Sequence, residues 1–250
     1  MKTVLITGAT AGFGKAIALK LSKYNYQLIL NGRSLEKLSP VIEEIKVGSK
    51  TPVYPLVFDV RAYEEAEKAI TTLPSAFKNV EILINNAGLA LELDTVDQAN
   101  KDDWNTMIDT NIKGVLFLTR LISPQMVFRK SGHIINIGSI SSHEVYKGGS
   151  VYCATKHALL ALTKGMRSDL LEYGIKVTQI SPGAAETNFS LTRFHGNSER
   201  AEQVYQGFTA LDAEDIAEAV EFVLNRPAHV NIDEILLTPT AQFNGVIIRK

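Results

Sequence analysis

The fold is decided near the N-terminus by the stretch Val4-Leu5-Ile6-Thr7-Gly8-Ala9-Thr10-Ala11-Gly12-Phe13-Gly14, which continues into the amphipathic segment Lys15–Leu21. The apolar triplet predicts a short buried strand, and the glycines after it allow the backbone to turn tightly into a helix. The N-terminus of a helix offers free N–H groups and a partial positive charge. A strand, a glycine turn and a helix in this order are typical of a site for the phosphates of a dinucleotide.

Two other interpretations of this glycine turn have to be weighed. A plain turn between a strand and a helix binds nothing, but a position within a strand–helix–strand unit favours the phosphate site. A P-loop would need glycine where Ala9 stands, and serine or threonine where Ala16 stands. The stretch therefore counts against a nucleoside triphosphatase or a kinase.

The residues after the second predicted strand, Gln27–Leu30, indicate which dinucleotide would bind. At this place a carboxylate binds a ribose 2′-hydroxyl, whereas an arginine accommodates a 2′-phosphate. Residues 26–35 contain no Asp or Glu, but they contain Arg33. We therefore expect NADP in preference to NAD, although Arg33 could also be a solvated residue at the start of a helix. Ser34 is expected to cap that helix.

Apolar strands and amphipathic helices alternate along the whole chain, with no internal linker and no low-complexity segment. The strands are continuous apolar runs, as expected for a sheet that is covered on both faces. Five further strands are predicted at Val53–Phe58, Glu81–Ile84, His133–Ile137, Lys176–Ile180 and Ile235–Leu237. The pattern predicts a single doubly wound α/β domain of the Rossmann type over residues 1–250, with a seven-stranded parallel sheet.

Polar residues follow the predicted strands, at the edge where ligands bind in an open α/β sheet. Asp59, after the third strand, could cap the next helix or accept a hydrogen bond from an adenine amino group. Asn86 follows the fourth strand. Ser139 follows the fifth, where it could bind a substrate or belong to an ordinary serine-rich loop. Asn111 interrupts the apolar pattern of a helical region from Lys101 to Leu121, which indicates a bend or a buried water site.

Tyr152 and Lys156 lie four residues apart in a predicted helix from Ser150 to Tyr173, so they share one face of it. Ser150 is expected to cap this helix. A free tyrosine titrates near ~10, and a neighbouring ammonium favours the phenolate and lowers that pKa. The pair could therefore exchange protons near neutral pH, although most exposed tyrosines and lysines at helical spacing have no function.

The composition argues against several classes of function. The chain has 250 residues, 45% of them hydrophobic and 21% charged, with a net charge of −1 and no basic block. We therefore expect neither nucleic acid nor a membrane surface as a partner. The N-terminal apolar run is too short for a signal peptide or a membrane span. Because Cys153 is the only cysteine and the five histidines form no HExxH motif, we expect no disulfide, no metal site and a cytoplasmic location.

Together these motifs resemble those of the short-chain dehydrogenase/reductase family over essentially the whole chain. The matching residues are Thr7-Gly8-x-x-x-Gly12-x-Gly14, Asn85-Asn86-Ala87-Gly88, Asn111, Ser139, Tyr152-x-x-x-Lys156 and Pro182-Gly183. The resemblance implies hydride transfer, with Tyr152 as general acid/base and Lys156 as the group that tunes its pKa and anchors a ribose. It also implies that Ser139 polarises a carbonyl and that Asn111 holds a water relay. The cofactor contacts that it implies are Gly8, Thr10, Ala11, Gly12, Phe13, Gly14, Arg33, Ser34, Asp59, Val60, Asn86, Tyr152, Lys156, Pro182, Gly183 and Thr187.

A narrower resemblance is to the NADP-dependent 3-hydroxy acid dehydrogenases, which oxidise serine, allo-threonine and related 3-hydroxy acids, or reduce semialdehydes. It rests on Asn86-Ala87-Gly88-Leu89-Ala90-Leu91, Trp104-x-x-Met107-Ile108-Asp109-Thr110-Asn111, His133–Ser139, Ala185–Ser190 and Pro227–Ile232. Asn31, before the Gly-Arg pair, departs from the pattern of that subgroup. The family also implies a homotetramer that assembles through the helices at 111–122 and 151–173, which carry more apolar residues than one core face requires.

The polar segment 186–210 is predicted to be a mobile substrate lid. A 3-hydroxy acid has a carboxylate that needs a cation, and Arg193, His195 or Arg200 could supply it, unless these are solvated charges of a loop. Two alternatives to a 3-hydroxy acid dehydrogenase stay open. One is another carbonyl or 3-oxoacyl reductase on the same scaffold. The other is a non-catalytic NADP-binding sensor, which we would expect to lack part of the catalytic set.

Overall fold

Seven strands form one sheet, and every neighbouring pair of strands in it is parallel. In the computed structural model, which describes all 250 residues, the strand order is β3-β2-β1-β4-β5-β6-β7. The strands are β1 (Lys2–Ile6), β2 (Tyr26–Gly32), β3 (Val53–Val57), β4 (Val80–Asn85), β5 (Gly132–Ile137), β6 (Ile175–Pro182) and β7 (Glu234–Leu237). The predicted doubly wound α/β fold with a seven-stranded parallel sheet is confirmed.

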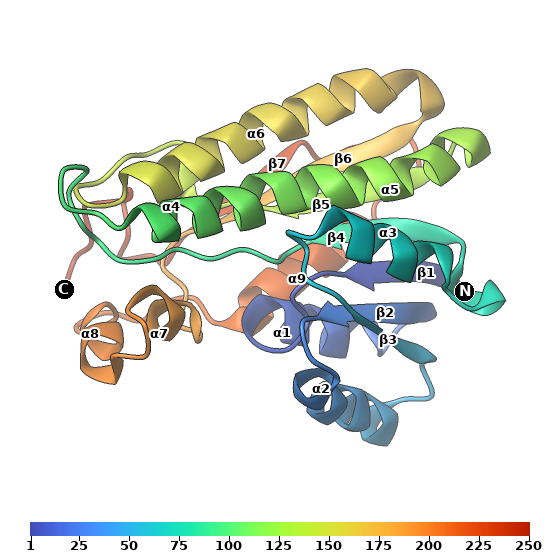
Figure 1. The fold of residues 1–250 in the computed structure, drawn as a ribbon, viewed down its shortest axis with the longest axis horizontal. Coiled ribbons are helices and arrows are strands. Elements are labelled where there is room, and N and C mark those ends of the chain that lie inside the picture. The colour runs from blue at the N-terminus through green and yellow to red at the C-terminus, as the bar shows by residue number, and fades with distance from the viewer.

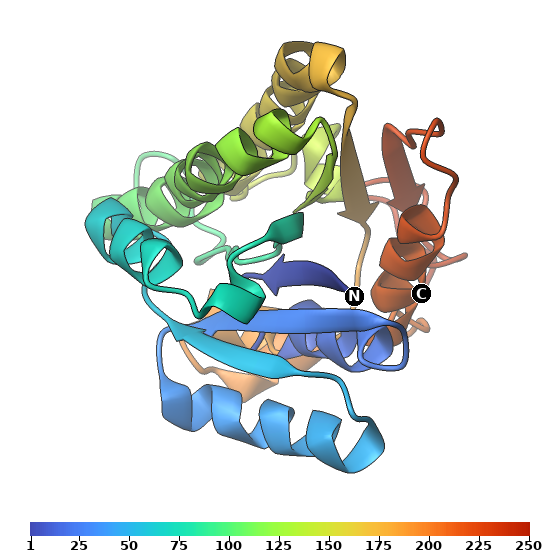
Figure 2. The ribbon, with the colours of Figure 1, turned by 90° about the vertical axis from the view of Figure 1, so that its right-hand side faces the viewer.

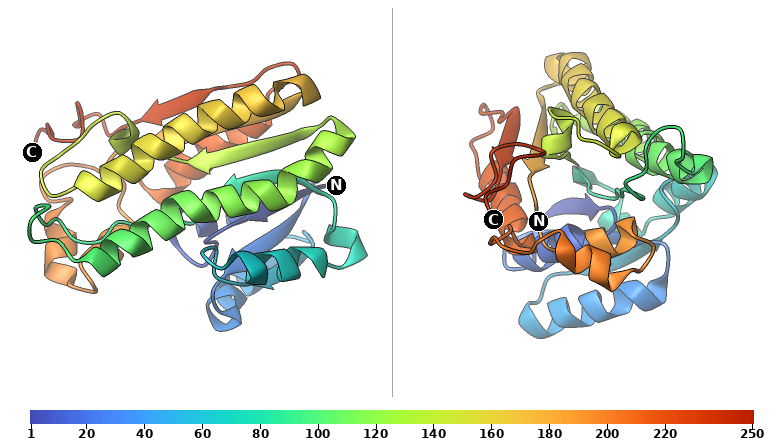
Figure 3. Two further views of the ribbon diagram at one scale, coloured as in Figure 1. Left: turned by 45° about the horizontal axis from the view of Figure 1, so that its top comes forward. Right: turned by 90° about the vertical axis from the view of Figure 1, so that its left-hand side faces the viewer.

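Helices cover both faces of this sheet (Figures 1 and 2). They are α1 (Gly12–Leu21), α2 (Leu35–Gly48), α3 (Tyr63–Thr71), α4 (Lys101–Ile108), α5 (Gly114–Arg129), α6 (Ser150–Leu170), α7 (Phe189–Arg193), α8 (Ser198–Gln203) and α9 (Ala213–Leu224). A π-helix at Asp109–Lys113 joins α4 to α5, and short 3₁₀ helices lie at Ser75–Phe77, Ile140–Ser142 and Leu171–Tyr173. Figure 3 (left) shows α3, α5 and α6 side by side on one face.

Two apolar cores hold the sheet in place, one on each face. The first packs α1, α2 and α9 against the sheet through residues such as Ile17, Val41 and Val220. The second packs α3, α5 and α6 through residues such as Leu118 and Leu159. Each large aliphatic side chain that is fully buried stabilises the fold by about 1.5–3 kcal/mol. Burial from both sides explains why the strands are continuous apolar runs. Because all the strands are parallel, their carboxyl ends lie along one edge of the sheet.

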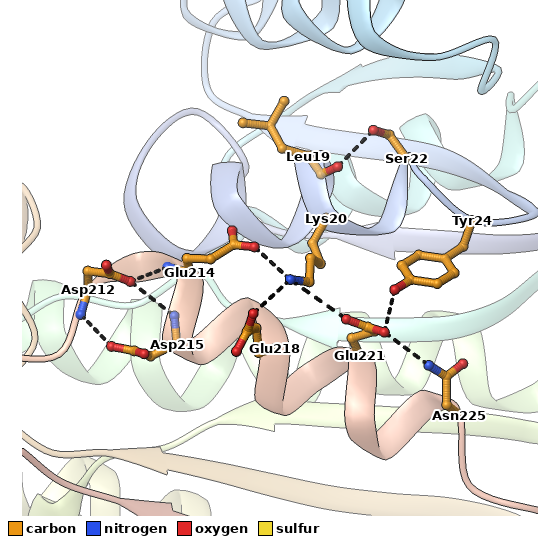
Figure 4. Close-up of polar contacts among 10 residues, drawn as sticks. All are labelled: Leu19, Lys20, Ser22, Tyr24, Asp212, Glu214, Asp215, Glu218, Glu221 and Asn225. Atoms are coloured by element: carbon orange, nitrogen blue, oxygen red, sulfur yellow. Dashed lines mark hydrogen bonds and ion pairs between the residues drawn. The ribbon is translucent and has the colours of Figure 1, made fainter.

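A cluster of charges ties α1 to α9 (Figure 4). Lys20 Nζ lies 2.7 Å from a carboxylate oxygen of Glu214 and 3.0 Å from one of Glu218. The hydrogen bonds to these two carboxylates raise the pKa of Lys20. α9 itself begins with a capping box, in which Asp212 and Asp215 each accept a hydrogen bond from the other's backbone N–H. The helix that follows the glycine turn is therefore anchored at its far end.

Of the predicted helix caps, Ser34 is confirmed and Ser150 is wrong. The Ser34 hydroxyl accepts a hydrogen bond from the Lys37 N–H at 3.4 Å and so caps α2. Ser150 is instead the first helical residue of α6, because Gly149 holds the cap position, with no side chain to offer. A serine can cap a helix only from just outside it, where its backbone is still extended.

The helical region predicted from Lys101 to Leu121 is interrupted, as the polar residue Asn111 indicated. α4 ends at Ile108, and Asn111 lies in the middle of the π-helix that precedes α5. No helix of the protein is both long and apolar enough to cross a membrane. No group of three or more His, Cys, Asp or Glu side chains is arranged to hold a metal ion.

Candidate active site

A cleft with an empty volume of about 1140 Å³ opens at the carboxyl end of the sheet, where the strand order reverses between β1 and β4. Ligands of open α/β sheets bind at such switch points. Ten of the predicted cofactor residues line this cleft, namely Gly8, Thr10, Ala11, Gly12, Phe13, Arg33, Asp59, Val60, Asn86 and Thr187. The other six lie outside its lining: Gly14, Ser34, Tyr152, Lys156, Pro182 and Gly183.

The glycine turn is held in shape by backbone geometry and by one amide side chain. Gly8 and Gly12 have φ angles of 64° and 51°, a region that favours glycine. A Cβ on Gly14 would overlap the carbonyl oxygen of Gly8 and lie 2.6 Å from Asn86 Nδ2. The same Nδ2 donates to the carbonyl oxygens of Thr7 and Gly8, at 2.8 and 3.1 Å. Gly14 therefore serves close packing beneath the cleft, and Asn86 ties the turn to the end of β4.

Two arginines line the end of the cleft next to β2 and β3. Arg33 was predicted, whereas Arg61 was not, and its only signal in the sequence was Asp59 two residues earlier. The Arg61 guanidinium lies 2.7 Å from the Asp59 carboxylate, and the hydrogen bonds from Arg61 hold the pKa of Asp59 below its usual value. Asp59 as a helix cap is wrong, because α3 begins only at Tyr63. Two guanidinium groups against one carboxylate leave this wall positive, which suits a phosphate group.

Asn31, which departs from the subgroup's pattern, is fully buried below this wall. Its Nδ2 donates hydrogen bonds to the carbonyl oxygens of Leu56 and Phe58, both at 3.1 Å. The amide therefore joins the end of β2 to the end of β3 and the residue after it. Its role is structural, and it fixes the backbone two residues before Arg33.

Tyr152 and Lys156 lie on one face of α6, and both side chains are buried. Lys156 Nζ donates a hydrogen bond to the carbonyl oxygen of Ile137 at 2.9 Å, and it lies 5.9 Å from the centre of the Tyr152 ring. Burial lowers the pKa of Lys156 to about 8. An ammonium has three N–H donors, so two of those on Lys156 remain for a ligand such as a ribose.

The pKa of the Tyr152 phenol is raised above its ordinary value, chiefly by burial and further by the neighbouring Tyr146. Arg193 and a hydrogen bond with Ser139 act in the opposite direction. From the sequence we expected Lys156 to lower the pKa of Tyr152, but its ammonium donates a hydrogen bond to the main-chain carbonyl of Ile137. The Arg193 guanidinium carbon lies 5.3 Å from the centre of the Tyr152 ring. The Arg193 guanidinium therefore lies nearer to the Tyr152 ring than the Lys156 ammonium does.

Asn111 connects the loop after β4 to the helix that carries Tyr152. Its Oδ1 accepts a hydrogen bond from the Leu89 N–H at 2.9 Å, and its Nδ2 donates to the Leu89 carbonyl at 2.8 Å. The Nδ2 also donates to the Thr155 hydroxyl at 3.1 Å, and that hydroxyl donates to the Tyr152 carbonyl at 2.7 Å. The amide thus braces the backbone of Tyr152, while its role as a water relay stays a prediction.

Pro182 and Gly183, which were predicted, lie at the end of β6, and several polar residues of the cleft were not predicted. β6 ends at Pro182, and the Gly183 N–H donates to the Leu237 carbonyl at 2.8 Å, so this pair closes the edge of the sheet next to β7. The structure adds four polar cleft residues that were not among the predicted cofactor contacts, Thr106, Thr110, Asn188 and Thr192, although Thr110 and Asn188 lie in segments of the narrower resemblance. Thr106 and Thr192 lie on the helices α4 and α7 and carry no pattern that sequence reasoning could use.

The predicted lid segment forms α7 and α8, which lie at the end of the molecule opposite the N-terminus (Figure 1). The loop after β4 holds it: the Glu92 N–H donates to the Arg193 carbonyl at 2.9 Å. The Glu92 carboxylate pairs with Arg200 at 2.7 Å, and His195 lies 3.2 Å from Asp103. Arg200 and His195 thus each lie beside a carboxylate, whereas Arg193 lies against the ring of Tyr152.

The chain is similar to known proteins along its whole length. The family model of the short chain dehydrogenases matches residues 2–198. The NADP-dependent 3-hydroxy acid dehydrogenase YdfG of Salmonella typhi is 42% identical over 249 residues, 99% of each chain. The serine 3-dehydrogenase of Rhizobium radiobacter is 41% identical over 240 residues, 96% of this chain and 94% of its own. A solved structure, the closed form of serine dehydrogenase complexed with NADP+, superposes with a TM-score of 0.93 at 41% identity, covering 99% of both chains. The chain therefore belongs to the short-chain dehydrogenase family.

Proposed function

We propose that this protein is an NADP-dependent dehydrogenase that transfers a hydride between a 3-hydroxy acid, of the serine, allo-threonine or 3-hydroxypropionate type, and NADP. The observation that carries the proposal is the arrangement of Tyr152, Lys156 and Ser139 beside a cleft with an arginine-lined end. The relatives named above, which act on 3-hydroxy acids or serine, support the choice of substrate class.

Tyr152 is the proposed general base in the oxidation. As the C3–H bond of the alcohol breaks with its electron pair, the hydroxyl proton moves to the phenolate oxygen of Tyr152, and the product is a semialdehyde from a primary alcohol such as serine or a 3-oxo acid from a secondary alcohol such as allo-threonine. The oxidised nicotinamide supplies the acceptor for the hydride. In the reverse reaction Tyr152 returns the proton to the carbonyl oxygen. Proton transfer by a positioned side chain contributes about 10²–10⁴-fold to the rate.

Two side chains assist this proton transfer in the proposal. Ser139 follows β5 and donates a hydrogen bond to the substrate oxygen, where negative charge develops. Lys156 uses its free N–H donors to hold the ribose, and its charge favours the phenolate when the ribose brings the two groups together. Asn111 acts less directly, because it fixes the helical turn on which Tyr152 stands.

Cofactor choice follows from the wall of the cleft next to β2. Arg33 and Arg61 present two guanidinium groups, and the single carboxylate there, Asp59, is already paired with Arg61. A ribose 2′-hydroxyl would find no free carboxylate at this place, whereas a 2′-phosphate would meet a positive surface. This supports NADP over NAD.

The proposal includes a lid at 186–210, a homotetramer and a cytoplasmic location. α5 exposes apolar side chains that a single subunit does not cover, with Leu116 40% and Phe128 90% exposed. Leu171, just after α6, is 70% exposed, and α5 and α6 lie side by side (Figure 3, left). Light scattering on the purified protein is expected to give four times the mass of the chain, and a monomeric mass would contradict the assembly.

The function is tested with a panel of alcohols and carbonyl compounds. NADP reduction is measured with serine, allo-threonine, 3-hydroxypropionate and 3-hydroxyisobutyrate, and the reverse reaction with a 3-oxoacyl thioester and neutral ketones. We expect turnover of the hydroxy acids with NADP and much less with NAD. Turnover of the thioester or ketones alone would point to another carbonyl reductase on this scaffold, and no turnover of any compound would point to a sensor.

The role of Tyr152 is tested by Tyr152→Phe, which removes one oxygen atom. We expect kcat to fall by about 10²–10⁴-fold, with NADP affinity unchanged in a direct titration. Tyr173→Phe, in the turn after the same helix, is the matched control and should retain full activity. Normal turnover by Tyr152→Phe would refute the proposed base.

A further inference from the structure

Arg193 has an unusual environment for an arginine on a short surface helix. Its guanidinium carbon lies 5.1 Å from the centre of the Phe189 ring, 5.3 Å from that of Tyr152 and 6.0 Å from that of Tyr146. One of its terminal amines donates a hydrogen bond to the Tyr146 hydroxyl at 3.0 Å. The group is thus enclosed by three aromatic rings, one of which belongs to the proposed general base.

The charge of Arg193 is not matched by any carboxylate. It forms no ion pair, whereas Arg200 pairs with Glu92 and His195 with Asp103 in the same lid. Its Nε is buried without a hydrogen-bond acceptor. A buried donor without a partner costs about 1–3 kcal/mol, more when the group is charged. The folded chain therefore keeps an uncompensated cation at this point, and an anion brought by a ligand would relieve that cost.

The direction in which Arg193 points separates it from the cofactor. Thr192 lines the dinucleotide cleft, but Arg193, the next residue, does not. It lies on the side of the lid that faces Tyr146 and Tyr152. An anion bound there would sit beside the phenol that exchanges the proton, which is where the substrate must lie.

The main chain of Arg193 is fixed by the loop on the other side of the site. Its carbonyl accepts a hydrogen bond from the Glu92 N–H at 2.9 Å, and Glu92 adopts a left-handed backbone with φ of 49°. The side chain of Glu92 also holds Arg200. When the lid takes this position, the guanidinium of Arg193 is therefore placed reproducibly over Tyr152.

We propose that Arg193 binds the carboxylate of the substrate and thereby makes the site prefer 3-hydroxy acids to neutral alcohols. This inference rests on the proposed function and adds to it the residue that determines specificity. On binding, the guanidinium would turn so that two of its N–H donors pair with the two carboxylate oxygens. The C3 hydroxyl would then lie within reach of Tyr152 and Ser139.

The test compares an acid with its uncharged counterpart. Turnover of 3-hydroxypropionate and of methyl 3-hydroxypropionate is measured with NADP for the wild type, Arg193→Met and Arg193→Lys. For Arg193→Met we expect kcat/KM on the acid to fall about 10- to 100-fold more than kcat/KM on the ester, the worth of hydrogen bonds to a charged group, because the loss of a cation beside Tyr152 affects both substrates alike. Arg193→Lys should recover part of the preference for the acid.

Arg200→Met is the matched control, because it removes a lid arginine that does not face Tyr152. It should lower kcat/KM on acid and ester by the same factor, since a loosened lid affects both substrates alike. An equal loss on acid and ester in Arg193→Met would overturn the inference, because Arg193 would then serve only the position of the lid. Thermal unfolding of each variant shows whether it is folded.

A second measurement does not depend on turnover. Malonate has a carboxylate but no hydroxyl that the enzyme could oxidise, and it is titrated calorimetrically into the protein with NADP. We expect binding by the wild type and at least about 10-fold weaker binding by Arg193→Met. Equal binding by both proteins would overturn the inference. If the wild type oxidised no hydroxy acid but lost malonate binding in Arg193→Met, the proposed function would fail while the anion site at Arg193 would stand.

Discussion

The two halves of the active site are held together by different means. The glycine turn is fixed by backbone geometry, by the close approach of Gly14 to Gly8 and by the amide of Asn86, all packed on the sheet. The segment 186–210 is held by the exposed contacts of Arg200 with Glu92 and of His195 with Asp103, whose side chains are 43% exposed for Arg200 and 53% for His195, and by the contacts of Arg193 with the Glu92 N–H and the Tyr146 hydroxyl. Exposed pairs contribute only about 0–1 kcal/mol each. The glycine turn is therefore fixed when the chain folds, whereas we expect the segment 186–210, the proposed lid, to open more easily than the turn deforms.

The largest expected effect concerns the sheet, at a buried histidine near the amino end of β5. His133 Nε2 lies 2.9 Å from the Thr178 hydroxyl, and burial lowers the pKa of His133 to about 3. In the unfolded chain a histidine binds its proton near pH ~6.5. Between pH 6.5 and 3 the unfolded state therefore binds a proton at His133 that the native state does not bind. As the pH falls through this range, the free energy of unfolding decreases by up to about 5 kcal/mol.

Chemical denaturation at a series of pH values measures this loss. His133→Gln keeps an amide group near the Thr178 hydroxyl but cannot titrate. Its stability should fall less steeply than that of the wild type as the pH drops from 6.5 to 4. Parallel curves for the two proteins would show that His133 is not the source of the acid sensitivity.

The next effect comes from the glycine turn itself. In Gly14→Ala the new Cβ would overlap the carbonyl oxygen of Gly8 and press on Asn86. Overpacking of this kind costs about 1–3 kcal/mol, and the displaced turn should also weaken NADP binding. Denaturant titration and cofactor titration measure the two losses.

Gly165→Ala is the control for this exchange. Gly165 lies inside α6, and a Cβ on it would meet nothing within 4 Å. The helical preference of alanine should stabilise that variant by about 0.5–1 kcal/mol. If Gly14→Ala were as stable as Gly165→Ala and bound NADP equally well, the turn would be less rigid than its packing indicates.

The smallest effect is expected in the lid. Arg200→Met breaks the pair with Glu92, and we expect kcat/KM to fall only about 2- to 5-fold, with global stability unchanged. The wild type should approach the variant as salt is added, because exposed charges are screened. A loss as large as that of Gly14→Ala in stability would mean that the lid is part of the folded core.

The sequence predicted the features that depend on local patterns. The glycine turn, the strand ends and the Tyr152–Lys156 pair are each specified by a few neighbouring residues, and the order of strands and helices follows from their alternation. The cap at Ser34 was predictable for the same reason. Ser150 failed because a shift of one residue decides whether a serine lies before a helix or within it.

The features that depend on contacts between distant segments were not predictable. Arg193, His195 and Arg200 are equivalent in the sequence, and only the partners from another loop, Glu92 and Asp103, show which cation is left without one. No sequence motif marked Arg61 as a residue of the cleft, because its position there depends on where the chain turns after β3. The pKa of Tyr152 is governed by burial, a property of the whole fold.

The π-helix at Asp109–Lys113 joins two helices, α4 and α5, that pack against different apolar clusters. Such a turn holds one residue more than an α-helical turn, and one residue corresponds to a rotation of about 100° around the axis. The wider turn accommodates this residue, so α4 and α5 face as they would in a continuous α-helix that is one residue shorter. Before it, α4 turns Met107 towards the cluster around Tyr152, and after it α5 turns Leu118 into the core beneath the sheet. Deleting a single residue here would turn the segment into an ordinary α-helical turn that leaves the apolar faces of α4 and α5 where they are, but it would displace Asn111 from Leu89 and Thr155.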